Sequence, residues 1–246
     1  MKKISIKNLK FSLDGNQILD DVNVEFVENN LYLIVGRNGS GKSTFLKILN
    51  KQLTATSGEI VINGRDINEY SNKELVSKIA YLPQKITFNA PYLVRELLEM
   101  SMYSSEFVSE DIIKKSIKEF QLEKLINKPI TRLSGGEIQR VLLASTYLVG
   151  GKFILLDEPF SFLDPGQRDL IFRQIKSLHE QNVRTFILVV NSLEEIFMFK
   201  DLDRVNILTL DNQRFNHYES MDKSFIKALS ELFNISLTKE GAIDEK

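Results

Sequence analysis

The sequence predicts an α/β fold with an antiparallel β region near its start and a helical region inserted into its core. Over residues 1–30, apolar and polar residues alternate around a turn at Asp14-Gly15-Asn16, which is typical of short antiparallel strands. Apolar runs such as Phe153–Leu156 and Phe186–Val190 instead predict buried parallel strands. No glycine occurs between Arg65 and Ser134, and part of that stretch has apolar residues near helical spacing.

Length and composition set further limits. A chain of 246 residues with 43% hydrophobic and 26% charged residues suits one large α/β domain with an inserted lobe. The balance of 32 Lys+Arg against 33 Asp+Glu argues against general nucleic-acid binding. The absence of cysteine excludes disulfides and thiolate metal sites. The start turns polar too soon for a signal peptide and no apolar run could span a bilayer, so we expect a soluble chain.

We expect the elements in the following order. The region around the first strands is followed by a strand at 31–35, a helix at 42–53, and strands at 59–62 and 79–82. After the helical lobe we expect a strand at 153–156, a helix at 167–181, a strand at 185–190, a helix at 193–200, strands at 205–210 and 214–218, and a helix at 221–235. The predicted single domain, 1–246, has a core of about 1–84 and 144–235, a helical subdomain of about 85–143, and a flexible tail of about 236–246.

The stretch Gly36–Thr44 lies between the predicted strand and helix and matches the phosphate-loop pattern GxxxxGK[ST]. Glycines let such a loop turn tightly with its N–H groups facing an anion, and the helix start adds a partial positive charge. A glycine-rich turn that matches by chance is disfavoured, because the strand and helix lie on the correct sides. The predicted nucleoside triphosphate site comprises Gly36, Arg37, Asn38, Gly39, Ser40, Gly41, Lys42, Ser43 and Thr44. Lys42 can reach the phosphates, and the Ser43 hydroxyl can bind Mg²⁺.

Two acids, Asp157 and Glu158, end the apolar strand that begins at Phe153. Ligands gather beyond the carboxyl ends of parallel strands. Asp157 is therefore placed to hold Mg²⁺, directly or through water, and Glu158 to polarise an attacking water. In isolation this pattern is also typical of an acidic turn, and the phosphate loop favours the functional interpretation.

The stretch Leu133–Arg140 places Ser-Gly-Gly before a helical pattern. By itself it predicts a helix cap whose N–H groups point outward, which suits a phosphate held elsewhere.

These motifs together resemble the ATPases of the ATP-binding cassette (ABC) family. The resemblance covers about residues 4–235, and its motifs occur in the family's order: the phosphate loop at 36–44, the glutamine loop at Gln84, the LSGGQ-type signature at 133–137, the acidic strand at 153–158 and the dimer loop at 161–164. The implied fold is a phosphate-loop NTPase core with an antiparallel β subdomain and an inserted helical subdomain. The alternative for Gln84 is a polar residue that merely ends a strand.

The resemblance implies that two subunits pack head-to-tail around ATP and Mg²⁺. Ser134, Gly135 and Gly136 would then contact the γ-phosphate of ATP held by the other subunit, and Asp164 would organise the interface. Gln84 would contact Mg²⁺ and the attacking water.

Two positions depart from the family pattern. Leu13 stands where an aromatic ring usually stacks on adenine, and Phe11, on the same predicted strand face, is expected to substitute in part. Asn191 stands where the family has a histidine that contacts the γ-phosphate, and it can donate a hydrogen bond but carries no positive charge. Slow hydrolysis, or dependence on a better-equipped partner, follows as a hypothesis. His179 is expected to be a surface residue rather than a ligand.

The motifs from Asn63 to Leu97 most resemble ATPases of metal-chelate importers (siderophore, haem or cobalamin). The alternatives are an energy-coupling-factor importer, an ABC exporter, a soluble non-transport cassette ATPase, or a regulatory subunit with little hydrolysis. The partners implied are a second ABC ATPase subunit, in a homodimer or heterodimer, and integral membrane permease subunits, with a solute-binding protein for an importer and no nucleic acid. The expected location is cytoplasmic, peripheral on the inner face of the cell membrane. Residues 88–103 are expected to dock the permease or else to fill the lobe's own core.

Overall fold

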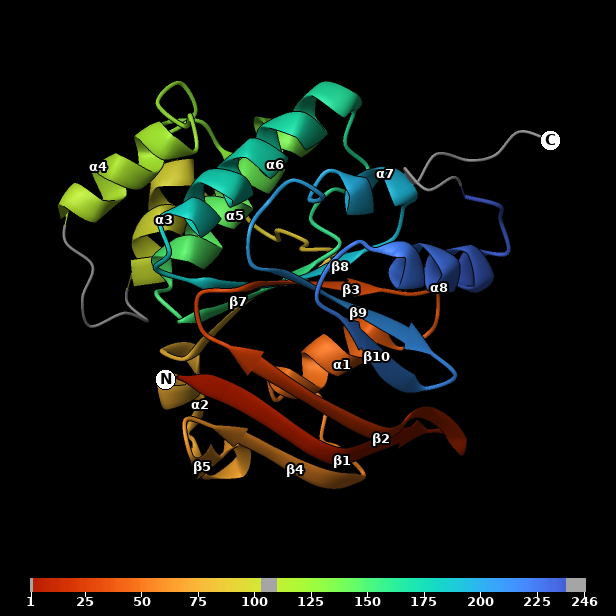
Figure 1. Cartoon of the computed structure of the whole chain (residues 1–246). Coiled ribbons are helices and arrows are strands. Elements are labelled where there is room, and N and C mark those ends of the chain that lie inside the picture. The colour runs from red at the N-terminus through yellow and green to blue at the C-terminus, as the bar shows by residue number, and fades with distance from the viewer. Residues whose placement is uncertain (1, 103–109, 238–246) are drawn as a thin grey trace. The chain divides into compact units, whose positions relative to one another are not determined.

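The structure, a computed structural model, describes residues 2–102 and 110–237 (Figure 1). The chain divides into two compact units. Unit 1 contains the described residues up to Ile67 and from Ile187 onward, and unit 2 contains those from Asn68 to Phe186. Each unit is described below by itself.

Unit 1 begins with an antiparallel sheet in the order β2-β1-β4-β5. Its strands are β1 (Lys3–Leu13), β2 (Asn16–Val27), β4 (Ser57–Ile62) and β5 (Arg65–Asp66). The pairing of β1 with β2 confirms the predicted antiparallel strands around Asp14-Gly15-Asn16, and its register shifts near Leu9 and Phe11. The alternating apolar side chains enter the core of this unit, where Ile4, Ile6 and Phe26 are buried.

The rest of unit 1 places the predicted phosphate loop between a strand and a helix. The strand β3 (Leu31–Val35) is buried along its whole length and pairs in parallel with β9 (Val205–Asp211), which pairs antiparallel with β10 (Arg214–Tyr218). The helix α1 (Lys42–Leu49) follows the loop. Its Phe45 ring lies 6.1 Å from Phe26 and 4.9 Å from Phe215, so aromatic packing from β2 and β10 fixes this helix.

The last helices of unit 1 are α7 (Leu193–Phe197) and α8 (Lys223–Phe233). The ring of Phe225 on α8 lies 5.5 Å from that of Tyr218 on β10. The strand β8 (Thr185–Val190) is fully buried, and the division between the two units falls within it.

Unit 2 pairs two parallel strands, β6 (Ile79–Leu82) and β7 (Phe153–Asp157), with Ile79 opposite Phe153. Its helices are α2 (Asn72–Val76), α3 (Val94–Met102), α4 (Glu110–Glu119), α5 (Gly135–Leu148) and α6 (Pro165–Glu180), and a 3₁₀ turn spans Ile130–Arg132. A second 3₁₀ turn, Ile67–Glu69, lies at the division between the units. The helix α5 contacts α3, α4, α6 and β6, so it is the central helix of this unit.

Some predicted boundaries and environments were wrong. The helix after the phosphate loop ends at Leu49 rather than near residue 53, and α7 ends at Phe197 rather than near residue 200. His179 is 2% exposed, because its position on α6 faces the interior rather than the surface.

The predicted core, helical subdomain and tail stay predictions. The described residues of 85–143 all belong to unit 2, which also holds β6 and β7, and most of the predicted tail lies outside the described residues. No helix within the described ranges is long and apolar enough to cross a membrane.

Candidate nucleotide-binding and catalytic sites

The phosphate loop in unit 1 folds around the ammonium group of Lys42. Its Nζ donates hydrogen bonds to the backbone oxygens of Gly36, at 2.7 Å, and of Arg37, at 3.0 Å. The lysine is only 4% exposed. Gly41 has a φ of +106°, and a Cβ there would lie 2.9 Å from a methyl carbon of Ile18. Both the backbone conformation and the space therefore require glycine at this position.

The N-terminus of α1 differs from most other helix starts in the described chain. Gly41 is its N-cap and supplies no side-chain hydrogen bond, whereas side chains cap α2, α5, α6, α7 and α8 at Ser71, Ser134, Asp164, Ser192 and Asp222. The first N–H groups of a helix have no partner inside the helix. Donors left without a side-chain cap, beside a positive helix end and a buried ammonium, fit the phosphates of a nucleotide.

A cavity of about 240 Å³ lies beside this loop in unit 1. It is lined by Gln17, Ile18, Arg37, Gly39, Ser40 and the β9–β10 turn at 210–213. The turn is fastened to β2 because the backbone N–H of Asp20 donates to the oxygen of Gln213 at 2.9 Å. The Asp20 carboxylate also pairs with Lys10 and Arg214. The hydrogen bond from Lys10 is the main cause that lowers the pKa of Asp20, and the hydrogen bond from Arg214 lowers it further.

Leu13 ends β1 with 54% of its surface exposed, so it is accessible to a ligand. Phe11 is 5% exposed and belongs to the core. The expectation that Phe11 substitutes for a stacking ring is therefore wrong. The strand pairing is irregular on both sides of Phe11, so simple alternation does not predict its environment.

Asn191 follows β8 and is held by the first turn of α7. Its backbone N–H donates to Oε2 of Glu195 at 3.0 Å, and the N–H of Glu195 donates to the hydroxyl of Ser192 at 3.2 Å. The Oδ1 atom of Asn191 is buried and accepts no hydrogen bond from any described residue. A polar atom in this condition suits a ligand or a water.

In unit 2, Asp157 ends β7 with 2% of its surface exposed. The hydroxyl of Tyr81, on the paired strand β6, donates to its Oδ2 at 3.2 Å. Burial raises the pKa of Tyr81 above its ordinary value, and the negative charge of Asp157 raises it further. The phenol therefore keeps its proton and stays a donor. A buried carboxylate oriented by a hydroxyl donor fits the oxygen ligand that Mg²⁺ prefers.

Glu158 receives two hydrogen bonds on one carboxylate oxygen, Oε2. Gln84 donates through Nε2 at 2.5 Å and Ser161 through its hydroxyl at 2.9 Å. The structure thus brings the predicted residues Gln84 and Glu158 together, although Gln84 follows β6 and Glu158 follows β7. Tyr81 was not predicted as a site residue, and Ser161 was predicted only as part of the dimer loop at 161–164, not as a partner of Glu158.

The signature stretch starts α5 with a capping box. The hydroxyl of Ser134 accepts from the N–H of Glu137 at 3.3 Å, and Oε2 of Glu137 accepts from the N–H of Ser134 at 2.8 Å. This second bond is the main reason why the pKa of Glu137 lies below its ordinary value. A Cβ on Gly136 would lie 2.3 Å from the side chain of Gln167 on α6, whereas nothing lies within 4 Å of one on Gly135. Gly135 is therefore the open position of this helix start.

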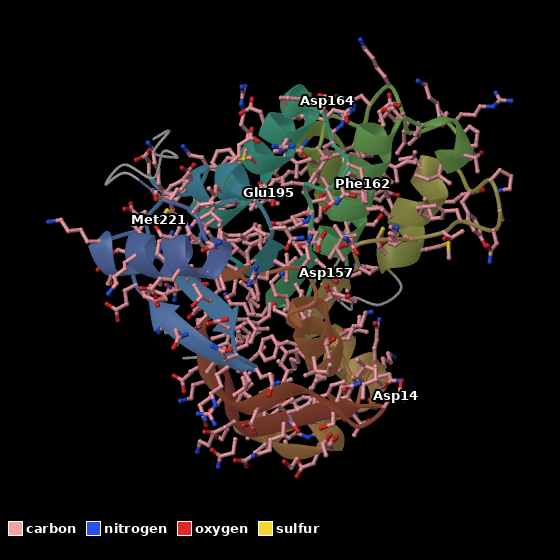
Figure 2. All side chains as sticks on the ribbon, turned by 90° about the vertical axis from the view of Figure 1, so that its right-hand side faces the viewer. Asp14, Asp157, Phe162, Asp164, Glu195 and Met221 are labelled. Atoms are coloured by element: carbon pink, nitrogen blue, oxygen red, sulfur yellow. The ribbon has the colours of Figure 1, made fainter. Side chains whose placement is uncertain are left out.

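Asp164 is the N-cap of α6, and its Oδ1 accepts from the N–H of Gln167 at 2.9 Å. Figure 2 labels Asp157, Phe162 and Asp164 along the segment that leads from β7 into α6. A capping aspartate before a proline is a complete structural explanation of this residue, so a role at an interface stays a prediction.

The predicted site residues therefore fall into two groups. Unit 1 holds the phosphate loop, Leu13 and Asn191, and unit 2 holds Gln84, the signature residues and the segment from Asp157 to Asp164. Contacts within the second group join Gln84 with Glu158, and the signature Gly136 lies close to Gln167.

Comparison with known proteins gives one family. The profile of the family described as ABC transporter matches residues 19–161, more than half of the chain. The energy-coupling factor transporter ATP-binding protein EcfA1 of Oenococcus oeni is 32% identical over 92% of this chain and 86% of its own. The iron(3+)-hydroxamate import ATP-binding protein FhuC of Bacillus subtilis is 29% identical over 81% of this chain and 77% of its own. The dimeric ATP-binding cassette MJ0796, solved with ADP and phosphate, has a TM-score of 0.73 at 24% identity, over 88% of this chain and 98% of that one.

Proposed function

Because the chain belongs to the ABC transporter family and has its α/β ATPase fold, we propose that it powers solute transport by ATP-driven head-to-tail dimerisation. The family consists of ATPases, and this chain is an ABC ATPase. The observation that carries the proposal is the phosphate loop, where a buried ammonium meets a helix start without a side-chain cap. ATP is the cofactor, and we propose Mg²⁺ as its counterion.

The predicted site residues are assigned roles in the hydrolytic step. Ser43, Gln84 and Asp157 are proposed to hold Mg²⁺, which would neutralise phosphate charge when bound. Glu158 is proposed as the base that takes a proton from the attacking water. Among these side chains, the hydrogen bond from Gln84 to Glu158 supports their joint action.

The signature is assigned to a second subunit's nucleotide. We propose that Ser134, Gly135 and Gly136 contact the γ-phosphate of ATP held by the other copy or by a related ATPase. The open surroundings of Gly135 support this assignment, and Asp164 is proposed to order the dimer loop. The MJ0796 cassette was solved as a dimer.

We propose that Leu13 weakens the contact with the base and that Asn191 slows hydrolysis. Leu13 is exposed enough to contact a base but offers no ring for stacking. Asn191 presents an amide where a charged imidazole would otherwise offset phosphate charge. We therefore propose slow hydrolysis for this chain on its own.

The transported solute is proposed to be a metal chelate, supported by likeness to an iron(3+)-hydroxamate import protein and to cobalamin import proteins. An energy-coupling factor importer is the second candidate, favoured by the 32% identical EcfA1 relative. A permease and a solute-binding protein encoded beside this gene would support the first candidate. An exporter, a soluble cassette ATPase and a regulatory subunit are the remaining alternatives. Co-purification with an integral membrane protein would exclude the soluble one.

We propose that the helical part of unit 2 docks the permease, which would place this subunit on the inner face of the membrane. Two sets of apolar side chains stand out in the predicted docking stretch, while Phe88, Leu93, Leu97 and Met102 are half-buried. Val94 and Leu98 are buried, whereas Tyr92 is 40% and Met100 is 53% exposed. The first set fills the core of the lobe, and the second is available to a partner. Tyr103, at the end of that stretch, lies outside the described residues.

The Glu158→Gln variant tests the proposed function. It should bind ATP but lose hydrolysis, because an amide cannot accept the proton of water. ATP should then trap a dimer that is visible by sedimentation, and the control Glu180→Gln, an exposed position on α6, should behave as wild type. Undiminished hydrolysis by Glu158→Gln would show that the base lies elsewhere.

A further inference from the structure

The carboxylate of Glu158 is held at one oxygen only. Both of its hydrogen bonds, from Gln84 and from Ser161, end on Oε2, and no donor among the described residues reaches Oε1. Two donors on one oxygen fix the rotation of a carboxylate and leave its other oxygen available as an acceptor. The arrangement therefore selects which oxygen can accept a proton.

The turn that carries Ser161 is held under conformational strain. The backbone N–H of Ser161 donates to the oxygen of Glu158 at 3.1 Å. Glu158 has a φ of +53° and Phe162 a φ of +64°, a region that residues other than glycine seldom adopt. Such strain persists only where the surroundings fix it, and it concentrates at functional sites.

A second contact joins the same two segments of unit 2. The Nζ atom of Lys85, next to Gln84, lies 5.6 Å from the ring centre of Phe162, next to Ser161. The Phe162 ring is 84% exposed, so burial does not hold it in place. The segment after β6 is thus attached to the turn after β7 at two adjacent points.

From these contacts we propose that Ser161 is a positioning residue for ATP hydrolysis that acts through Glu158. Its hydroxyl, together with the amide of Gln84, holds Oε2 so that Oε1 faces the attacking water. The water oxygen forms a bond to the γ-phosphorus while its proton passes to Oε1. The bond from that phosphorus to the bridging oxygen breaks, and its electron pair leaves with ADP. This inference rests on the proposed role of Glu158.

The test compares the turnover of Ser161→Ala and Ser161→Thr with that of wild type at saturating Mg-ATP. Loss of the hydroxyl lets the carboxylate rotate, and misplacement of a catalytic group lowers the rate steeply. The kcat of Ser161→Ala should fall about tenfold with KM within about twofold. Ser161→Thr keeps a hydroxyl and should restore most of the turnover.

The matched control is Ser71→Ala. The Ser71 hydroxyl donates to Oε2 of Glu74 at 2.8 Å, with the same three-residue spacing but at the start of α2. Its loss should lower the melting temperature and leave kcat unchanged. A purely structural role of Ser161 would give this same result, or a fall in kcat that threonine does not restore, and either would overturn the inference.

Glu158→Gln is measured alongside, so that the two proposals fail separately. If this variant binds ATP without hydrolysing it while Ser161→Ala turns over normally, only the positioning role is wrong. If Glu158→Gln hydrolyses ATP normally, both the proposed role of Glu158 as the base and the positioning role of Ser161 are wrong.

Discussion

The helices α1 and α5 both begin at a glycine-containing motif, but of these two only α5 has a side-chain cap at its start. At α1 the N-cap is Gly41, which has no side chain and supplies no capping hydrogen bond. At α5, Ser134 and Glu137 bond each other's backbone N–H groups in a capping box. Helix α1 therefore has no side-chain cap at its start, whereas two N–H groups at the start of α5 are bonded by side chains and an acid lies there. A helix start proposed to hold a nucleotide's phosphates can thus lack a side-chain cap, while one proposed to contact a phosphate held elsewhere can be self-capped.

The largest effect should follow from Lys42→Ala. The ammonium lies on the loop carbonyls and is the only side-chain charge that we assign to the phosphates. A hydrogen bond to a charged group is worth about 1.5–3 kcal/mol, so ATP affinity should fall by up to about 100-fold. Calorimetric titration with ATP measures this change, and Lys47→Ala, an exposed lysine on the same helix, should bind normally. Unchanged ATP affinity in a stable Lys42→Ala protein would contradict the assignment of residues 36–44 as a phosphate loop.

The next effect separates α5 from an ordinary capped helix. Ser134→Ala and Ser71→Ala remove the same capping hydroxyl from α5 and α2, and each should cost about 1 kcal/mol of stability. Only Ser134→Ala should also abolish ATP-driven dimerisation, measured by sedimentation in the Glu158→Gln background. Equal dimerisation in both variants would mean that the start of α5 has a structural role alone.

The same contrast explains how much the sequence could predict. The phosphate loop, the strand before Asp157 and the start of α5 follow local rules of spacing and capping, so their residues were predictable. The bonds from Tyr81 to Asp157 and from Gln84 to Glu158 join residues 76 and 74 positions apart. They depend on the pairing of β6 with β7, which no local pattern contains.

The predictions for the environments of Phe11 and His179 failed for similar reasons. Phe11 lies between two irregularities of strand pairing, which break the alternation on which its prediction rested. His179 is near the end of α6, and its burial depends on what packs against that helix rather than on its own sequence. Such positions require the tertiary structure.

A third helix start provides a smaller test. Asn191 precedes α7, whose Ser192 cap and Glu195 carboxylate already bond the local N–H groups. Asn191→His would add a group that donates to the γ-phosphate and, when protonated, offsets its charge. Removal of such a donor typically costs about 10²-fold or more, and asparagine keeps one donor, so kcat should rise about tenfold. The test measures the steady-state turnover of wild type and of Asn191→His at a protein concentration that supports dimerisation. Equal or lower turnover in the variant would show that Asn191 does not slow hydrolysis.

The smallest effect concerns the charge at the start of α5. Glu137→Gln keeps an oxygen that can accept from the N–H of Ser134, but it removes a negative charge from the surface that we assign to a phosphate. One charge near a helix end is worth about 0.3–1 kcal/mol, so ATP-driven dimerisation should strengthen about two- to fivefold. The control Glu74→Gln removes the matching charge from the capping box of α2 and should leave dimerisation unchanged. The pH dependence of stability has a defined sign, because the hydrogen bond from the Ser134 N–H lowers the pKa of Glu137 below its ordinary value. This carboxylate stabilises the fold above that value, and its contribution is lost as the pH falls through the lowered pKa. The difference in melting temperature between wild type and Glu137→Gln should therefore change over that acidic range and stay constant above it. If dimerisation weakens in Glu137→Gln, the charge organises the start of α5 for its ligand rather than opposing it.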